Sequence, residues 1–157
     1  MKRIPCFILA ALLLAANLLM VSGAAAAGCT VSAVGVVFGN FSPLTITTVE
    51  NTGSITVNCT DVSSYSIVLS AGGGDFSQRR MTTGGGSPTF LNYNLYRDAT
   101  YQQVWGDGSS GNDTVSLSNP VNGQNNIHTI YGRIPVGIQR NAHVGSYSDT
   151  ITVTVAF

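Results

Sequence analysis

The stretch GSYSDTITVTVAF, residues 145–157, decides the fold of this chain. Its side chains alternate, with threonine or another small residue between positions that carry larger ones. The larger positions share one parity and are Tyr147, Asp149, Ile151, Val153, Val155 and Phe157. A two-residue period of this kind predicts a β-strand with one mainly apolar face. Such a strand needs a partner along each backbone edge and a cover for its apolar face.

The rest of the chain repeats this pattern in short pieces. Gly, Asn, Ser and Pro are concentrated between the pieces, where they favour turns. The alternation predicts strands at Thr30–Phe38, Ser54–Thr60, Tyr65–Ala71, Phe90–Arg97, Thr114–Leu117, Ile127–Ile134 and Tyr147–Phe157, with a further short piece at Tyr101–Trp105. About seven short strands with frequent turns indicate an all-β, antiparallel sandwich or barrel.

The first 27 residues have the pattern of a secretory signal peptide. Met1–Arg3 is basic, residues 4–21 are almost wholly apolar, and SGAAAAG then supplies the small residues of a cleavage site. We therefore predict a signal peptide at 1–27 and one domain at 28–157. An N-terminal membrane anchor of similar length is the alternative reading of the same segment.

The composition of the predicted mature chain limits its partners. The whole chain has seven basic and seven acidic residues, and the basic ones include Lys2 and Arg3 of the leader. The domain from Gly28 onward therefore has no lysine and a small net negative charge. It offers no basic patch to nucleic acid or anionic lipid.

Three cysteines become two when the leader is removed. Cys6 lies in the leader, which leaves Cys29 and Cys59 as an even pair in an oxidising compartment. We predict a disulfide between them, which would stabilise the fold by about 3–4 kcal/mol. Acylation of Cys29, as in bacterial lipoproteins, is the alternative, although Ala26 stands where such signals carry Leu and Cys59 would remain unpaired.

No segment carries the pattern of an active site. Neither His128 nor His143 stands at a metal-ligand spacing from another histidine, and no G-x-S-x-G motif is present. The loop at residues 107–113 has oxygen donors for calcium but lacks the EF-hand pattern, so we interpret it as a turn. The glycine runs 72–74 and 84–86 lack the spacing of phosphate loops and are predicted to be flexible turns. We expect no enzyme, cofactor, metal site or small-molecule substrate.

Four stretches resemble one known family. They are CTVSAVGVVFGNFSP at 29–43, GSITVNCT at 53–60, FLNYNLYRDATYQQVWGDG at 90–108 and YGRIPVGIQRNAHVGSYSDTITVTVAF at 131–157. Together they resemble the spore coat protein U family, which includes pilin subunits of archaic chaperone–usher pili such as the Csu pili. The resemblance covers essentially the whole mature chain in order.

The resemblance implies an immunoglobulin-like sandwich that lacks one strand and has a hydrophobic groove beside its last strand. In this family a periplasmic chaperone fills the groove first, and the N-terminal extension of a neighbouring pilin fills it in the fibre. An outer-membrane usher assembles the subunits on the surface of a Gram-negative cell, where the pili serve adhesion and biofilm formation. The implied groove and chaperone-binding residues of this chain are Tyr147, Ile151, Val153, Val155 and Phe157.

The sequence departs from the pilin pattern at its N-terminal side. A donor segment needs roughly ten residues before the first cysteine strand, at ~3.3 Å each, whereas cleavage after Ala27 leaves only Gly28 before Cys29. We therefore expect a subunit that accepts a strand without donating one, in a tip-like or terminating position. The alternatives are an outer-membrane barrel, whose strands would have to be longer, and a free-standing secreted coat or ligand-binding sandwich.

Overall fold

The structure is a computed structural model that describes residues 26–42, 47–84, 89–109, 111–136, 139 and 142–157. All regular secondary structure within these ranges is β-strand, which confirms the all-β prediction. The strands are β1 (Gly28–Val34), β2 (Val49–Thr60), β3 (Ser64–Leu69), β4 (Arg79–Thr82), β5 (Phe90–Tyr96), β6 (Val115–Ser118), β7 (Asn125–Ile134) and β8 (Val153–Ala156).

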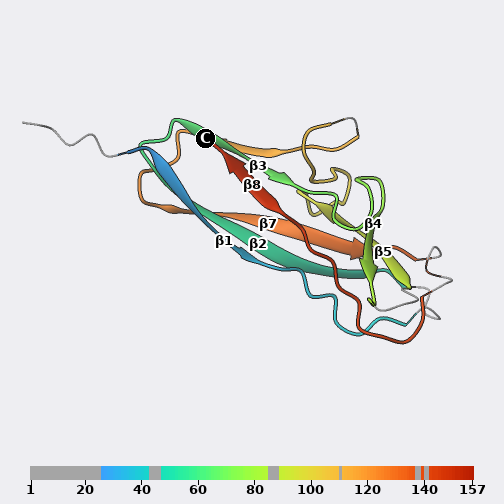
Figure 1. Cartoon of the computed structure of the whole chain (residues 1–157). Coiled ribbons are helices and arrows are strands. Elements are labelled where there is room, and N and C mark those ends of the chain that lie inside the picture. Colours follow the sequence, from blue (N-terminus) through green and yellow to red (C-terminus); the bar gives the residue numbers. More distant parts are fainter. Residues whose placement is uncertain (1–25, 43–46, 85–88, 110, 137–138, 140–141) are drawn as a thin grey trace, which may run out of the picture.

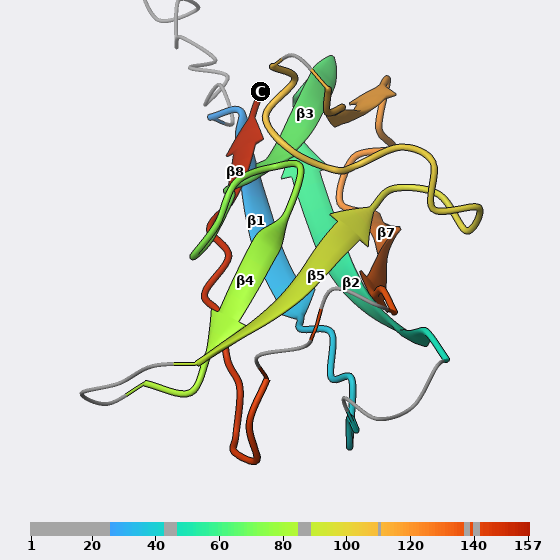
Figure 2. The same cartoon turned by 90° about the vertical axis from the view of Figure 1, so that its right-hand side faces the viewer.

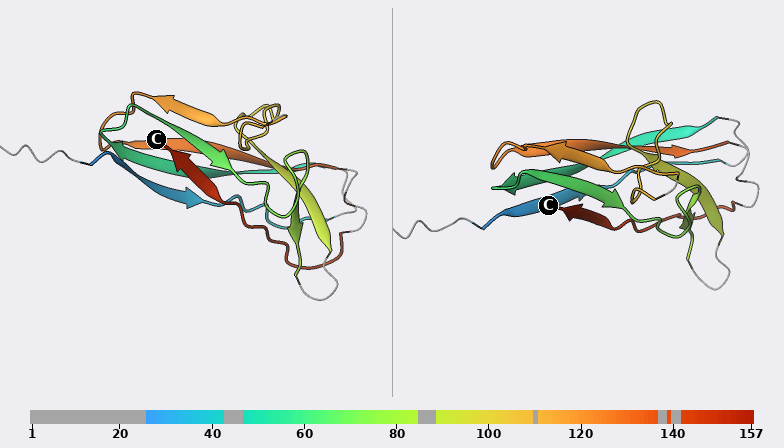
Figure 3. Two further views of the ribbon diagram at one scale, coloured as in Figure 1. Left: turned by 45° about the horizontal axis from the view of Figure 1, so that its top comes forward. Right: turned by 90° about the horizontal axis from the view of Figure 1, so that it is seen from above.

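The strands form two antiparallel sheets. One has the order β1-β2-β7-β5-β4 and the other has the order β6-β3-β8. The long pair β2 and β7 forms the centre of the larger sheet, with Ile55 opposite His128. The smaller sheet lies over one face of the larger sheet, so that β3 and β8 are above β1 and β2 in Figure 1 and in front of them in Figure 3. This two-layer arrangement confirms the predicted antiparallel sandwich.

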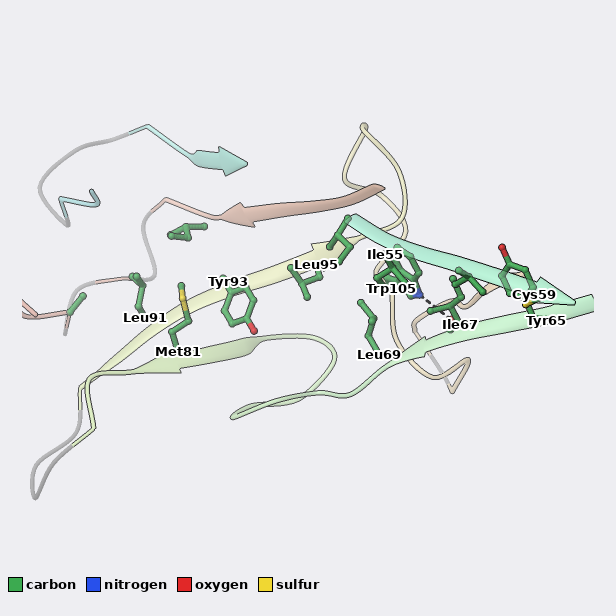
Figure 4. Packing of buried hydrophobic residues seen from close by; sticks show 14 residues of the cluster. Ile55, Cys59, Tyr65, Ile67, Leu69, Met81, Leu91, Tyr93, Leu95 and Trp105 are labelled. Carbon is green, nitrogen blue, oxygen red and sulfur yellow. Dashed lines mark hydrogen bonds between the residues drawn. The ribbon is translucent and has the colours of Figure 1, made fainter. Parts of the chain in front are cut away.

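The core lies between these layers, where the alternating apolar positions of both sheets meet. Ile55 and Val57 of β2 face Ile67 and Leu69 of β3, and all four side chains are buried. The indole of Trp105 is fully buried in the same cluster and donates from Nε1 to the Ile67 carbonyl at 3.0 Å, as Figure 4 shows. Because the indole N–H has a partner, the largest core side chain is buried without a polar penalty.

A buried arginine joins the loops at one end of this core. The side chain of Arg79 in β4 is fully buried and donates to the Ser70 and Trp105 carbonyls and to Asn94 Oδ1, at 2.6–3.1 Å. Burial lowers the pKa of this guanidinium, although nearby ionisable groups oppose the change. Since each of its nitrogens donates a hydrogen bond, Arg79 connects β4, β5 and two loops that are distant in sequence.

The structure corrects several predicted strand boundaries. β1 ends at Val34 instead of Phe38, and β4 is an additional strand that the alternation did not reveal. The last strand is also shorter than predicted, because only Val153–Ala156 pairs with β3. The residues before it bridge to the other sheet, at Thr82 and Ser148, so the C-terminal segment changes sheets before β8 begins.

The predicted disulfide is present. Cys29 and Cys59 are directly opposite each other on β1 and β2, and their sulfurs are bonded. The bond engages the Cys29 sulfur that lipid attachment would require. The predicted signal peptide falls almost wholly on residues 1–25, outside the described residues, and the division at residue 27 stays a prediction. Within the described part of the chain, no helix has the length and apolar character needed to span a membrane.

Candidate functional site

Two strand edges are open on the same side of the molecule. β1 is an edge of the larger sheet and pairs with β2, while β8 is an edge of the smaller sheet and pairs with β3. Figures 1 and 2 show β8 next to β1, with the two strands in different layers. Each edge leaves backbone N–H and C=O groups unpaired on the side away from its partner strand, which makes it a template for another strand.

On the same side of the molecule, an open groove of about 850 Å³ extends toward β4 and β5. Its N-terminal wall consists of residues 33–41, which begin with the last two paired residues of β1. Its C-terminal wall consists of residues 143–149 together with Ile151 and Val153. The floor between the walls is formed by the core side chains Leu69, Met81, Leu91, Tyr93, Leu95, Ile130 and Ile134. The groove therefore borders the hydrophobic core, whose side chains at the floor are at most 8% exposed.

The N-terminal wall is held by aromatic packing over a glycine. Val36 and Phe38 pack partly buried against the core, and the Phe38 ring meets the Tyr93 ring edge to face with centroids 5.9 Å apart. Both side chains lie over Gly132 of β7, where an added Cβ would be 2.7 Å from Val36 and 2.8 Å from Phe38. Only glycine at this position leaves room for the wall to lie so close to the sheet.

The C-terminal wall is held by polar contacts to β4, β5 and two neighbouring loops. Ser148 exchanges two backbone hydrogen bonds with Thr82, and the Tyr147 hydroxyl lies 2.8 Å from Thr89 Oγ1. The Asp149 carboxylate accepts hydrogen bonds from the Tyr93 hydroxyl at 2.7 Å and from the Gly73 amide at 3.0 Å. These contacts fix the segment where it passes from the larger sheet to β8.

The glycine run 72–74, which we predicted to be a flexible turn, has a definite steric role at this wall. Gly72 has a φ of +64°, which favours glycine, and a Cβ there would collide with the Asp149 carboxylate and with Ile151. The turn therefore lets the wall approach β3 closely.

Three of the five predicted groove residues line the groove. They are Tyr147, Ile151 and Val153. Val155 is partly buried against the core beyond the groove, and Phe157 is 62% exposed outside the groove lining. Their role in binding a strand stays a prediction.

Sequence analysis did not identify the N-terminal wall or the floor. The run VGVVFGNF at 34–41 contains the apolar residues of this wall, but its alternation was interpreted as a continuation of the first strand. The predicted strand Phe90–Arg97 contains Leu91, Tyr93 and Leu95 at alternate positions, but its alternation did not indicate that they would form the floor of a groove.

The two histidines occupy different environments. His128 Nε2 lies 2.8 Å from the hydroxyl of Tyr65, and burial lowers the pKa of its imidazole. His143 lines the mouth of the groove, in the C-terminal wall. Across the described residues, no three His, Cys, Asp or Glu side chains gather as a metal site would require. In the 107–113 loop, Asp107 accepts a hydrogen bond from the Ser109 amide within a turn. The pKa of Asp107 is lowered by hydrogen bonds from the Ser109 side chain and from this amide.

Comparisons with known proteins agree with this architecture. The family model described as Spore Coat Protein U domain matches residues 15–154. Among solved structures, the chain is similar to a chain in the crystal structure of the CsuC–CsuE chaperone–tip adhesion subunit pre-assembly complex from archaic chaperone–usher Csu pili of Acinetobacter baumannii. The two are 23% identical with a TM-score of 0.60, and the match covers 84% of this chain and 40% of that one. No curated protein sequence matches. The chain belongs to the Spore Coat Protein U domain family.

Proposed function

We propose that this protein is a structural subunit of a chaperone–usher pilus, or of a related surface coat, that accepts an extended strand from another chain. One observation carries the proposal: the facing edges of β1 and β8, with a groove of about 850 Å³ that opens onto the hydrophobic core. Its membership of the Spore Coat Protein U domain family and its likeness to a fold found in a pilus assembly complex support the same function.

The groove suits a strand better than it suits a compact ligand. An extended chain can pair its backbone with an open edge while every second side chain points toward the floor. Each apolar side chain that becomes fully buried contributes about 1.5–3 kcal/mol. Ordering each residue of the docked strand costs about 1–2 kcal/mol of conformational entropy. The strand must therefore bury apolar side chains along most of the groove to offset this cost. A strand that alternates in step with the floor meets this condition.

The partners follow from this function. They are a periplasmic pilus chaperone that covers the groove after secretion, an outer-membrane usher, and neighbouring subunits in the fibre. The signal peptide, passage through the periplasm of a Gram-negative cell, the surface location, and a role in adhesion or biofilm belong to the same proposal. The tip-like or terminating position predicted from the sequence remains a prediction.

Co-purification from the periplasm tests the proposal. The tagged chain is expressed with and without a pilus-type chaperone from its own genome, and one-to-one complexes are measured by size exclusion. We expect a stable complex that is lost in the double variant Val153→Asp, Val155→Asp, because two charges would then face the core. The matched control is Thr152→Asp, Thr154→Asp on the exposed face of the same segment, which should keep the complex.

The opposite result has a definite meaning. A protease-resistant monomer that forms no complex with the chaperone would indicate that the fold is stable without an added strand. The protein would then be a free-standing secreted coat or ligand-binding sandwich, and the subunit proposal would be wrong.

A further inference from the structure

Among the described residues that line the groove, one side chain, that of Asp149, is an acid or a base of the Asp, Glu, Lys and Arg group. Asp149 is partly buried in the C-terminal wall, close to Ile151 and across from the ring of Tyr93 in the floor. In the sequence it occupies the same parity as the apolar residues, where an alternating strand would ordinarily carry another valine or isoleucine. The fold places this carboxylate in the lining by contacts from three directions, so its position is fixed.

The hydrogen bonds of Asp149 leave one position open. An ionised carboxylate has about four acceptor positions. Three donors reach it in this structure: the Tyr93 hydroxyl on Oδ2, and the Gly73 and Thr150 amides on Oδ1. One acceptor position on Oδ2 therefore has no donor among the described residues, and Oδ2 also packs close to Gly72.

No cation is in contact with this carboxylate among the described residues. The ion pairs of those residues join Arg97 with Asp113 and Arg133 with Glu50. The nearby Arg79 interacts with Asp149 through its charge alone, because its donors are directed to Ser70, Asn94 and Trp105. A strand that covers the groove removes water from the open position, which is costly for a charged acceptor unless the strand supplies a donor.

We propose that Asp149 sets the register of the docked strand, by selecting a side chain with a hydrogen-bond donor at the one inward position opposite its carboxylate. This inference rests on the proposed function and adds the chemistry of the partner: alternating apolar residues with one serine, threonine, asparagine or lysine among them. A regular apolar alternation would fit equally well after a slip of two residues, so a polar position in the groove distinguishes one register from the others. A single buried asparagine fixes the register of coiled coils in the same way.

Synthetic peptides test this inference on the purified, disulfide-bonded chain. The probes are lysine-capped peptides of alternating threonine and valine, in which each inward valine in turn is replaced by serine, and dissociation constants are measured by fluorescence anisotropy. Serine loses apolar burial, so it should weaken binding at every inward position except one. At that position we expect binding about tenfold tighter than for the all-valine peptide, since hydrogen bonds to charged groups are stronger than neutral ones.

The variant Asp149→Leu is similar in shape and should bind the all-valine peptide best, with no position that favours serine. This variant leaves the Tyr93 hydroxyl without its acceptor. If it does not fold for that reason, the double variant Tyr93→Phe, Asp149→Leu removes the hydroxyl as well. The matched control is Thr150→Leu at the neighbouring exposed position, which should keep the wild-type serine preference.

Each further outcome contradicts a different statement. The inference is wrong, and the proposed function stands, if peptides bind the wild type but serine weakens binding everywhere. It is also wrong if the favoured position persists after Asp149 is replaced. If no peptide of the series binds the wild-type chain, the groove does not accept strands, and both proposals fail.

Discussion

Replacing Gly132 with alanine tests the packing that holds the N-terminal wall. The new Cβ would lie 2.7 Å from Val36 Cγ1 and 2.8 Å from the Phe38 ring. Carbon atoms in ordinary contact are about 3.5–4.0 Å apart, so the wall would have to move outward by roughly 0.7 Å or more. Because both side chains are partly buried against the core, this movement also separates Phe38 from Tyr93.

The expected magnitude combines two opposing effects. Inserting a methylene-sized group into a packed site costs about 1–3 kcal/mol. Replacing glycine in a strand interior recovers about 0.5–1 kcal/mol, because the unfolded chain loses conformational freedom. We therefore expect Gly132→Ala to lower the free energy of unfolding by about 1–2 kcal/mol, measured by urea denaturation with the disulfide intact.

The control uses a glycine in the wall itself. A Cβ on Gly35 would have no heavy atom within 4 Å, so Gly35→Ala should be neutral or slightly stabilising. Combining Gly132→Ala with Phe38→Leu should recover part of the loss, because the smaller side chain relieves the overlap. If Gly132→Ala and Gly35→Ala unfold at the same urea concentration, the wall does not depend on the glycine and this reasoning is wrong.

Two further predictions concern other parts of the fold. Arg79→Lys should lower the free energy of unfolding by about 3 kcal/mol, because one ammonium group cannot replace all the donors of a buried guanidinium. Thermal unfolding measures this loss of stability. An unchanged midpoint would contradict the hydrogen bonding of Arg79 described above. The lowered pKa of His128 means that the folded state prefers the neutral imidazole, so this contribution to stability is present above the ordinary pKa of 6.5 and is lost as the pH falls through the lower folded value. His128→Gln should therefore flatten the acid side of the profile of melting temperature against pH, and an identical slope in the variant would show that other groups cause it.

The sequence predicted the features that depend on local alternation. Ile55 and Val57 on β2, and Ile67 and Leu69 on β3, follow a two-residue period because neighbouring side chains of a strand point to opposite faces, and the structure buries all four. The disulfide was predicted for a different reason, because two cysteines in a domain predicted to be exported usually form a disulfide in an oxidising compartment.

The missed features depend on contacts between distant segments. Nothing near Gly132 in the sequence indicates that Phe38 will lie over it, and nothing near Gly72 indicates that Asp149 will approach it. β4 was not predicted because its buried positions are Arg79 and Met81. An arginine can be recognised as a core residue only when its hydrogen-bond acceptors are known. The end of β1 at Val34 has a similar cause, because the valines that follow it continue the apolar pattern while their backbone leaves β2.

The C-terminal segment connects these observations. A strand that stayed in one sheet from Tyr147 to Phe157 would have closed one edge of the sandwich along its whole length. This segment instead bonds to β4 at Ser148, changes sheets beside Asp149, and pairs with β3 only from Val153 onward. After this change of sheet, the segment forms one wall of an open groove whose floor contains core residues such as Leu91 and Leu95. The same polar contacts that make this turn possible therefore create the apolar groove and place a carboxylate within it, so a docked strand would have to satisfy both.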